Sequence, residues 1–114
     1  MAVRLRLDKP WRPLAPEEVD QIPGQLGVYQ IADARGTVLH IGQAGARSPF
    51  GLRSELQREV RERGPGHQFR LEVNMQYRSR WFELLMVHKA DHGSLPPDNA
   101  KNPPPLLGRL SPAV

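Results

Sequence analysis

The stretch that decides the fold is GVYQIADARGTVLHIG, residues 27–42. Two short apolar runs flank the turn DARG, and this pattern is typical of a β-hairpin. Asp33 and Gly36 suit the turn, because Asp bonds the local backbone and Gly accepts left-handed conformations. If the four-residue loop closes symmetrically, Tyr29 faces His40 on one side of the sheet. The hairpin is therefore expected to bring a phenol and an imidazole together over one spot.

The sequence predicts one short helix before the hairpin and three further elements after it. A short helix is expected to end before Pro23, and a longer one to cover residues 48–63, where Leu side chains recur every four residues. Alternating apolar residues predict a third strand over 68–76. Another helix is expected over 79–92, with Gly93 as its C-terminal cap. The order β-β-α-β-α predicts an α+β fold, in which helices flank a small antiparallel three-stranded sheet.

The length of 114 residues suits a single domain. Residues 1–21 are interpreted as an N-terminal extension that contains the short helix. Residues 22–102 form the expected core of the domain. Residues 103–114 are rich in Pro and are expected to be a C-terminal tail.

Composition narrows the class of protein further. The chain has no Cys, which excludes disulfides and thiolate metal sites, and it has no run of 18 apolar residues. We therefore expect a soluble, intracellular (cytoplasmic) protein without a membrane partner. Basic residues outnumber acidic ones 16 to 12, and 13 of the 16 are Arg. Since the planar guanidinium suits phosphate oxygens, this balance favours a nucleic-acid partner.

Five motifs in this order resemble those of the GIY-YIG nuclease superfamily. They are GVY (Gly27 to Tyr29), HIG (His40 to Gly42), Arg53 in FGLRSEL, Glu83 in WFELLMVH, and Asn99 in GSLPPDN. Asn102 in KNPPP is a second choice for the last position. The resemblance covers residues 22–102 and agrees with the expected order of elements.

The resemblance implies a metal-dependent endonuclease that hydrolyses a DNA phosphodiester, with DNA repair or recombination as its setting. In this family the Glu holds one Mg²⁺ or Mn²⁺ ion, which corresponds to Glu83 here. The family Arg contacts the phosphate, and Arg53 takes that position. Tyr29 would help to activate the attacking water, and the Asn supports the site or the fold. Gly27 and Gly42 are expected to be structural.

The same roles can be argued from chemistry. Mg²⁺ prefers oxygen ligands and lowers the barrier to phosphodiester hydrolysis. An acid at position 83, amid the apolar run WFELLMV, is costly to bury unless it is paired or binds metal. The alternative for Glu83 is an exposed helix Glu paired with Arg80 or Arg78. The alternative for Arg53 is a solvated helix face that also carries Arg58 and Arg61.

His40 is a departure from the family, which usually has Tyr at this position. An imidazole can accept a proton at neutral pH, so one hypothesis makes His40 the general base with Tyr29 orienting the water. The other hypothesis is an altered site with slowed or lost catalysis.

These observations leave three hypotheses for function. The first is the endonuclease. No target-reading domain is visible, so it would have low sequence specificity, cut specific DNA structures, or be aimed by a partner protein. The second is a catalytically altered nucleic-acid-binding domain on the same fold. In both, the predicted DNA-contacting residues are Arg47, Arg53, Arg58 and Arg61. The third is a protein-interaction module that works through its Pro-rich tail.

Overall fold

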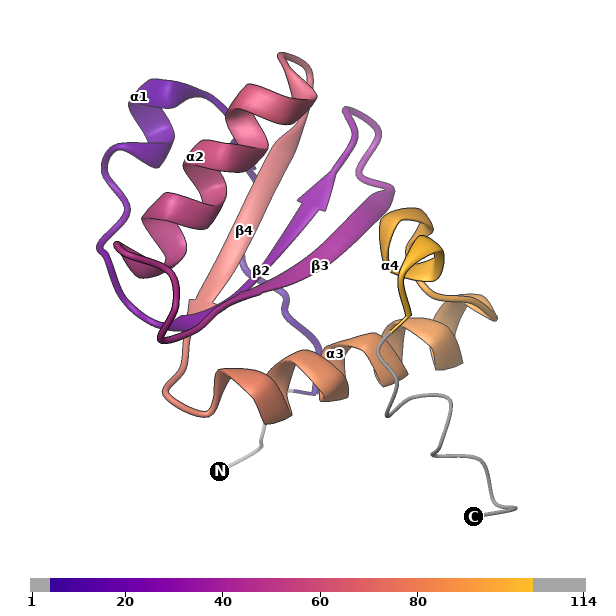
Figure 1. The fold of residues 1–114 in the computed structure, drawn as a ribbon. Coiled ribbons are helices and arrows are strands. Elements are labelled where there is room, and N and C mark those ends of the chain that lie inside the picture. Colours follow the sequence, from indigo (N-terminus) through magenta and orange to yellow (C-terminus); the bar gives the residue numbers. More distant parts are fainter. Residues whose placement is uncertain (1–4, 104–114) are drawn as a thin grey trace.

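The computed structural model describes residues 5–103 and contains a four-stranded antiparallel sheet in the order β1-β4-β2-β3 (Figure 1). The strands are β1 (Arg12–Pro13), β2 (Gly27–Ala32), β3 (Val38–Ala44) and β4 (Gln68–Val73). The predicted α+β class is confirmed, but the predicted number of strands is wrong. The additional strand, β1, has only two residues, which is too short for a recognisable alternating pattern.

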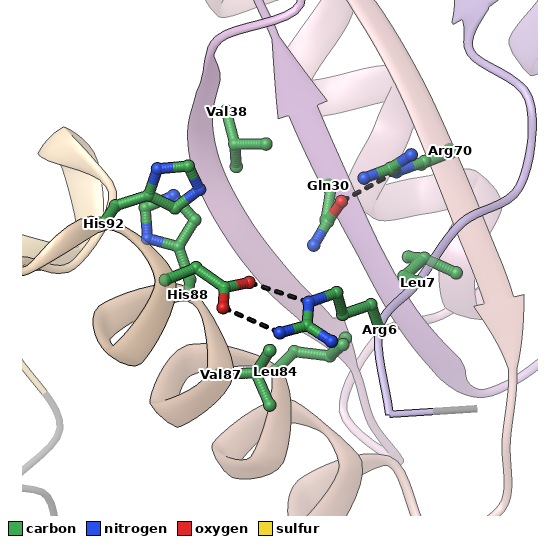
Figure 2. A pocket seen from close by; sticks show the side chains of 10 residues that line it. Arg6, Leu7, Gln30, Val38, Arg70, Leu84, Val87, His88 and His92 are labelled. Atoms are coloured by element: carbon green, nitrogen blue, oxygen red, sulfur yellow. Dashed lines mark hydrogen bonds and ion pairs between the residues drawn. The ribbon is translucent and has the colours of Figure 1, made fainter. Parts of the chain in front are cut away.

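Helices cover both faces of this sheet. They are α1 (Pro16–Val19), α2 (Gly51–Arg63), α3 (Tyr77–His92) and α4 (Pro97–Lys101). The first two pack on one face, α3 crosses the other, and α4 lies beside β3 (Figure 1). A small pocket lies between α3 and the sheet (Figure 2). The short helix α4 is not among the elements predicted from the sequence.

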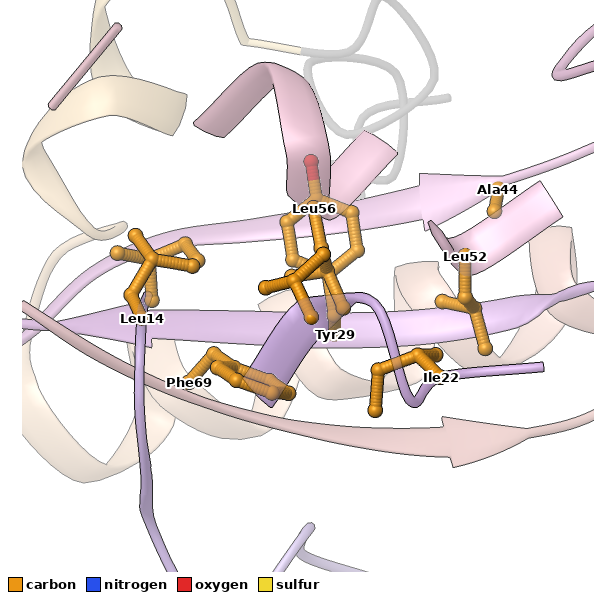
Figure 3. Close-up of a cluster of buried hydrophobic side chains, with 9 residues drawn as sticks. Leu14, Ile22, Tyr29, Ala44, Leu52, Leu56 and Phe69 are labelled. Carbon is orange, nitrogen blue, oxygen red and sulfur yellow. The ribbon is translucent and has the colours of Figure 1, made fainter. Parts of the chain in front are cut away.

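Two apolar clusters hold these layers together. The cluster beneath α1 and α2 contains Tyr29, which stands on β2 and points toward α2 (Figure 3). Its buried members are Leu14, Val19, Ile22, Tyr29, Ile31, Ala44, Leu52, Leu56 and Phe69. The cluster beneath α3 contains Leu7, Val28, Ile41, Leu84 and Leu85. Alternate residues of β2 thus face opposite clusters, as the pleat of a strand requires.

The register of the hairpin differs from the symmetric closure that we predicted. Tyr29 lies opposite Gly42, and His40 lies opposite Ile31. The amide of Asp33 bonds to the carbonyl of Thr37, which makes the turn one residue longer than assumed, and a bulge after Ile31 adds a second shift. Two single shifts restore the original face, so Tyr29 and His40 remain on the same side as diagonal neighbours.

The long helices lie close to their predicted positions. The helix α2 begins at Gly51, three residues later than predicted, and the Ser48 hydroxyl donates to Glu55. Gly51 has φ +55°, and a Cβ there would lie 2.3 Å from the carbonyl oxygen of Gln25. The helix α3 begins two residues earlier than predicted, and Gly93 ends it in the left-handed conformation as expected.

The described part of residues 1–21 belongs to the packed domain. Leu7, Leu14 and Val19 are each at most 4% exposed, and β1 pairs with β4. This segment is therefore part of the core, not an addition to it. The predicted tail over 103–114 lies outside the described residues from position 104 onward.

Candidate functional site

The Tyr29 side chain is buried on the α2 face of the sheet. It is 1% exposed, and its hydroxyl donates to Oε2 of Glu59 at 2.8 Å. Burial raises the pKa of Tyr29 well above its ordinary value, and the charge of Glu59 raises it further. The phenol is consequently a neutral hydrogen-bond donor across the physiological pH range.

Gly42 makes room for this ring. A Cβ at position 42 would lie 2.3 Å from Cζ of Tyr29, closer than real contacts allow. Gly27 has a comparable role, because its Cβ would lie 2.2 Å from the carbonyl oxygen of Glu72. Both glycines of the GVY and HIG motifs thus permit close approach of a neighbouring group.

His40 lies beside the same phenol. The two ring centroids are 5.8 Å apart, and Nε2 of His40 lies 3.6 Å from Oε2 of Glu59. Nδ1 of His40 is buried and has no hydrogen-bond partner among the described residues. Burial lowers the pKa of His40, and the nearby Glu59 opposes this effect only in part. The net result favours a neutral imidazole.

Glu59 connects these groups to a chain of ion pairs. It is 3% exposed, and its Oε1 accepts a hydrogen bond from Nε of Arg63 at 2.7 Å. Arg63 also pairs with Asp98 of α4. The carboxylate of Glu59 is therefore held on both oxygens, by Arg63 on one and Tyr29 on the other.

Our sequence reasoning did not identify Glu59. The available signal was its position in α2, three residues after Leu56 and seven after Leu52, both of which are buried. That spacing places an acid on the buried face of the helix. An acid on such a face requires a partner, which Arg63 provides one turn later.

Glu83 does not lie in this cluster. Its side chain is 44% exposed and pairs with Arg80, which is the alternative given for Glu83 in the sequence analysis. Arg80 also donates to Oε2 of Glu72 at 3.0 Å and to the carbonyl oxygen of Leu5 at 2.9 Å. Because α3 packs on the opposite face of the sheet from α2, Glu83 and Tyr29 are separated by the sheet.

Glu83, the metal ligand that the resemblance implies, lies in an ion-pair cluster. The guanidinium of Arg80 binds both Glu83 and the neighbouring Glu72. Within residues 5–103, no three or more Asp, Glu or His side chains are grouped as metal ligands would be. Arg80 contacts Oε1 of Glu83, and the Glu83 side chain is 44% exposed.

The predicted DNA-contacting arginines differ in their surroundings. Arg53 lies in the first turn of α2, with its guanidinium 5.5 Å from the ring centroid of the exposed Phe50. Arg58 pairs with Glu55 at 2.6 Å and with Glu62 at 3.6 Å.

Arg47 and Arg61 are exposed and form no ion pair with any residue in the described range. Of the four predicted arginines, Arg47, Arg53 and Arg61 therefore have a charge that is available for a phosphate.

Asn99 binds the backbone of β3. It is 5% exposed, its Oδ1 accepts from the amide of Ile41 at 2.8 Å, and its Nδ2 donates to the carbonyl of Ile41 at 2.9 Å. Trp81 donates to the same carbonyl. Asn102 is exposed at the C-terminal end of α4. Of the two candidates, Asn99 is the one integrated into the fold.

The structure therefore defines a small α+β domain with a buried Tyr–Glu–His cluster on one face and a carboxylate–arginine cluster on the other. The chain belongs to a family described as a domain of unknown function (DUF7508), which matches residues 5–91. No curated protein and no solved structure matches the chain. None of the helices in the described part of the chain is long and apolar enough to cross a membrane.

Proposed function

We propose that this chain is a nucleic-acid-binding domain on a GIY-YIG-like fold whose hydrolytic site is altered. The observation that carries this proposal is the separation of Glu83 from Tyr29 by the sheet, with Glu83 held by Arg80. A metal-dependent nuclease needs its metal ligand and its water-activating groups over one phosphate. His40, in place of the Tyr that the family usually has, also supports an altered hydrolytic site.

The binding surface in this proposal is the basic row on α2 and the loop before it. Arg53 and Arg61 lie two turns apart along α2, and Arg47 lies in the preceding loop. Side chains without acidic partners can replace the counterions of a phosphate backbone. The exposed Phe50 beneath Arg53 adds an aromatic surface on which a base could stack.

A second candidate is the metal-dependent endonuclease, and the contact between Tyr29, His40 and Glu59 favours it. A neutral His40 can accept a proton from water, and Glu59 would stabilise the imidazolium that forms. The partly exposed imidazole, at 23%, gives that group access to solvent. The buried Tyr29 would orient the carboxylate of Glu59 in this scheme.

Binding is tested by fluorescence anisotropy on labelled single-stranded, duplex, flap, branched and nicked DNA at several salt concentrations. We expect affinity to fall as the salt concentration rises. In the double variant Arg53→Gln/Arg61→Gln, the slope of log binding constant against log salt concentration should be smaller by roughly 0.7–0.9 for each phosphate that is no longer neutralised. Arg78→Gln is the matched control, because Arg78 is exposed at the start of α3. Affinity that does not depend on salt would overturn the proposal.

Cleavage of the same DNA panel separates the two candidates. The assay compares Mg²⁺, Mn²⁺ and chelator, with the wild-type chain beside Glu83→Ala. An altered binding domain cuts none of the substrates and binds equally well in both variants. Metal-dependent cutting that Glu83→Ala abolishes would instead establish the endonuclease.

A further inference from the structure

The pocket between α3 and the sheet lies on the face opposite the Tyr29 cluster (Figure 2). Its volume is about 160 Å³, close to that of an apolar cavity that accommodates benzene. Leu7, Val38, Leu84 and Val87 form apolar walls, and Figure 2 shows Gln30 and Arg70 on one side of them. The pocket thus combines an apolar body with polar groups at one end, which is typical of small-molecule sites.

Gln30 directs hydrogen-bond donors into this pocket. The residue is 6% exposed, and its Oε1 accepts from Nε of Arg70 at 2.8 Å. Because Arg70 can only donate, this bond fixes which end of the amide is oxygen. The amide nitrogen then points into the pocket (Figure 2) and has no partner among the described residues.

Arg70 supplies a positive charge at the same end. Its hydrogen bonds go to two neutral oxygens, that of Gln30 and the backbone carbonyl of Lys9. The guanidinium stacks on Trp11 with 4.1 Å between its central carbon and the ring centroid, which fixes its plane. Burial lowers the pKa of Arg70, and Asp8 opposes this effect through its charge. An anion beside Arg70 would stabilise this partly buried charge.

The other charges that line the pocket nearly cancel. Arg6 and Asp91 form a two-bond ion pair, with distances of 2.8 and 2.7 Å. Nδ1 of His88 donates to the carbonyl oxygen of Ser94 at 3.1 Å, and burial lowers the pKa of His88. Because Arg6 and Asp91 pair with each other, the positive charge at the polar end of the pocket comes from Arg70, which also lies near the charge of Asp8.

We propose that this pocket binds a small monocarboxylate, with its carboxylate on Arg70 and the amide nitrogen of Gln30. Nε and Nη1 of Arg70 donate to Gln30 and Lys9, so Nη2 is the nitrogen available to a carboxylate oxygen, beside the amide nitrogen of Gln30. The rest of the ligand would be an apolar group about the size of a benzene ring, packed against Leu84 and Val87. This site is independent of the proposed DNA surface, which lies on α2.

Benzoate is the probe, titrated against the full chain and followed by methyl and amide NMR shifts. We expect saturable shifts at Leu7, Val38, Leu84 and Val87, with benzamide and inorganic phosphate binding at least tenfold more weakly. Benzamide lacks the charge, and phosphate lacks the apolar body. Equal binding of either compound, or benzoate shifts outside these residues, would overturn the proposal.

The variant Arg70→Gln should weaken benzoate binding tenfold or more, and Arg78→Gln should leave it unchanged. Circular dichroism melting of each variant checks that it folds. If Arg70→Gln fails to fold, Arg70→Lys serves in its place, because it retains the charge and loses the planar fork. Unchanged affinity in a folded Arg70 variant would refute the assignment of the carboxylate to this side chain.

Discussion

The hydroxyl of Tyr29 donates to the carboxylate of Glu59, 2.8 Å away, in the interior between β2 and α2. The bond joins the GVY motif to an acid that no motif contains. It also explains why both residues are buried, since each satisfies a polar group of the other.

Removal of this hydroxyl should destabilise the fold. Tyr29→Phe leaves one oxygen of the buried Glu59 without its donor, and we expect a loss of roughly 1.5–3 kcal/mol in the free energy of unfolding. Urea denaturation measures this loss of unfolding free energy. Tyr77→Phe is the matched control, because the Tyr77 hydroxyl forms no hydrogen bond with any described residue. Equal losses in the two variants would show that the Tyr29 bond contributes no stability of its own.

Gly42→Ala should also destabilise the fold, because the added methyl group meets the ring of Tyr29 at 2.3 Å. Overpacking of this kind costs about 1–3 kcal/mol. A double-mutant cycle with Tyr29→Leu tests the cause, since a smaller side chain at position 29 removes the clash. Additive losses in the double variant would mean that the methyl group is rejected for another reason.

The stability should fall as the pH is lowered below about 6.5, the ordinary pKa of His. Burial lowers the pKa of His40 in the folded state, so the unfolded chain binds more protons in this range. The stability that the neutral His40 contributes is fully present above pH 6.5. It is lost as the pH falls from 6.5 to the lowered pKa of His40 in the folded state. His40→Gln should flatten the curve of unfolding free energy against pH.

Two other groups must be separated from His40 in this experiment. Burial also lowers the pKa of His88, so the variant His88→Gln is measured in parallel. Hydrogen bonds from Arg80 and Asn74 outweigh burial and hold the pKa of Glu72 below 4.5, outside the window. A pH dependence that His40→Gln leaves intact and His88→Gln removes would assign the effect to His88.

Asn99→Ala should be the more damaging of the two Asn substitutions. It removes both side-chain bonds to the backbone of Ile41, so the amide of Ile41 loses its acceptor and the carbonyl keeps only the bond from Trp81. We expect a loss of roughly 2–4 kcal/mol, from two bonds and the desolvation of the groups they satisfied. Asn102→Ala, at an exposed position, should stay within about 0.5 kcal/mol. Thermal melting of both variants compares them directly.

The sequence was most informative where local pattern determines structure. Apolar runs on either side of the turn DARG placed β2 and β3, alternation placed β4, and the apolar stripe of Leu52 and Leu56 placed α2. The register of the hairpin was beyond this reasoning, because the bulge after Ile31 leaves no signal in the alternation of the flanking residues.

The candidate site was harder to predict because its partners are distant in sequence. The burial of Glu59 depends on Arg63 one turn later and on Tyr29 thirty positions earlier. The exposure of Glu83 depends on how α3 rotates on the sheet, which the apolar run WFELLMV does not specify. Charge compensation between elements is set by tertiary packing, so single-sequence patterns do not contain it.

The contact between Asn99 and Ile41 has a consequence for how this chain behaves among copies of itself. β3 forms the outer edge of the described sheet, and an uncovered edge is a template on which another strand can add. The Asn99 amide offers one donor and one acceptor to Ile41, as a neighbouring strand would. A single side chain thereby occupies the centre of the edge and opposes self-association by strand addition.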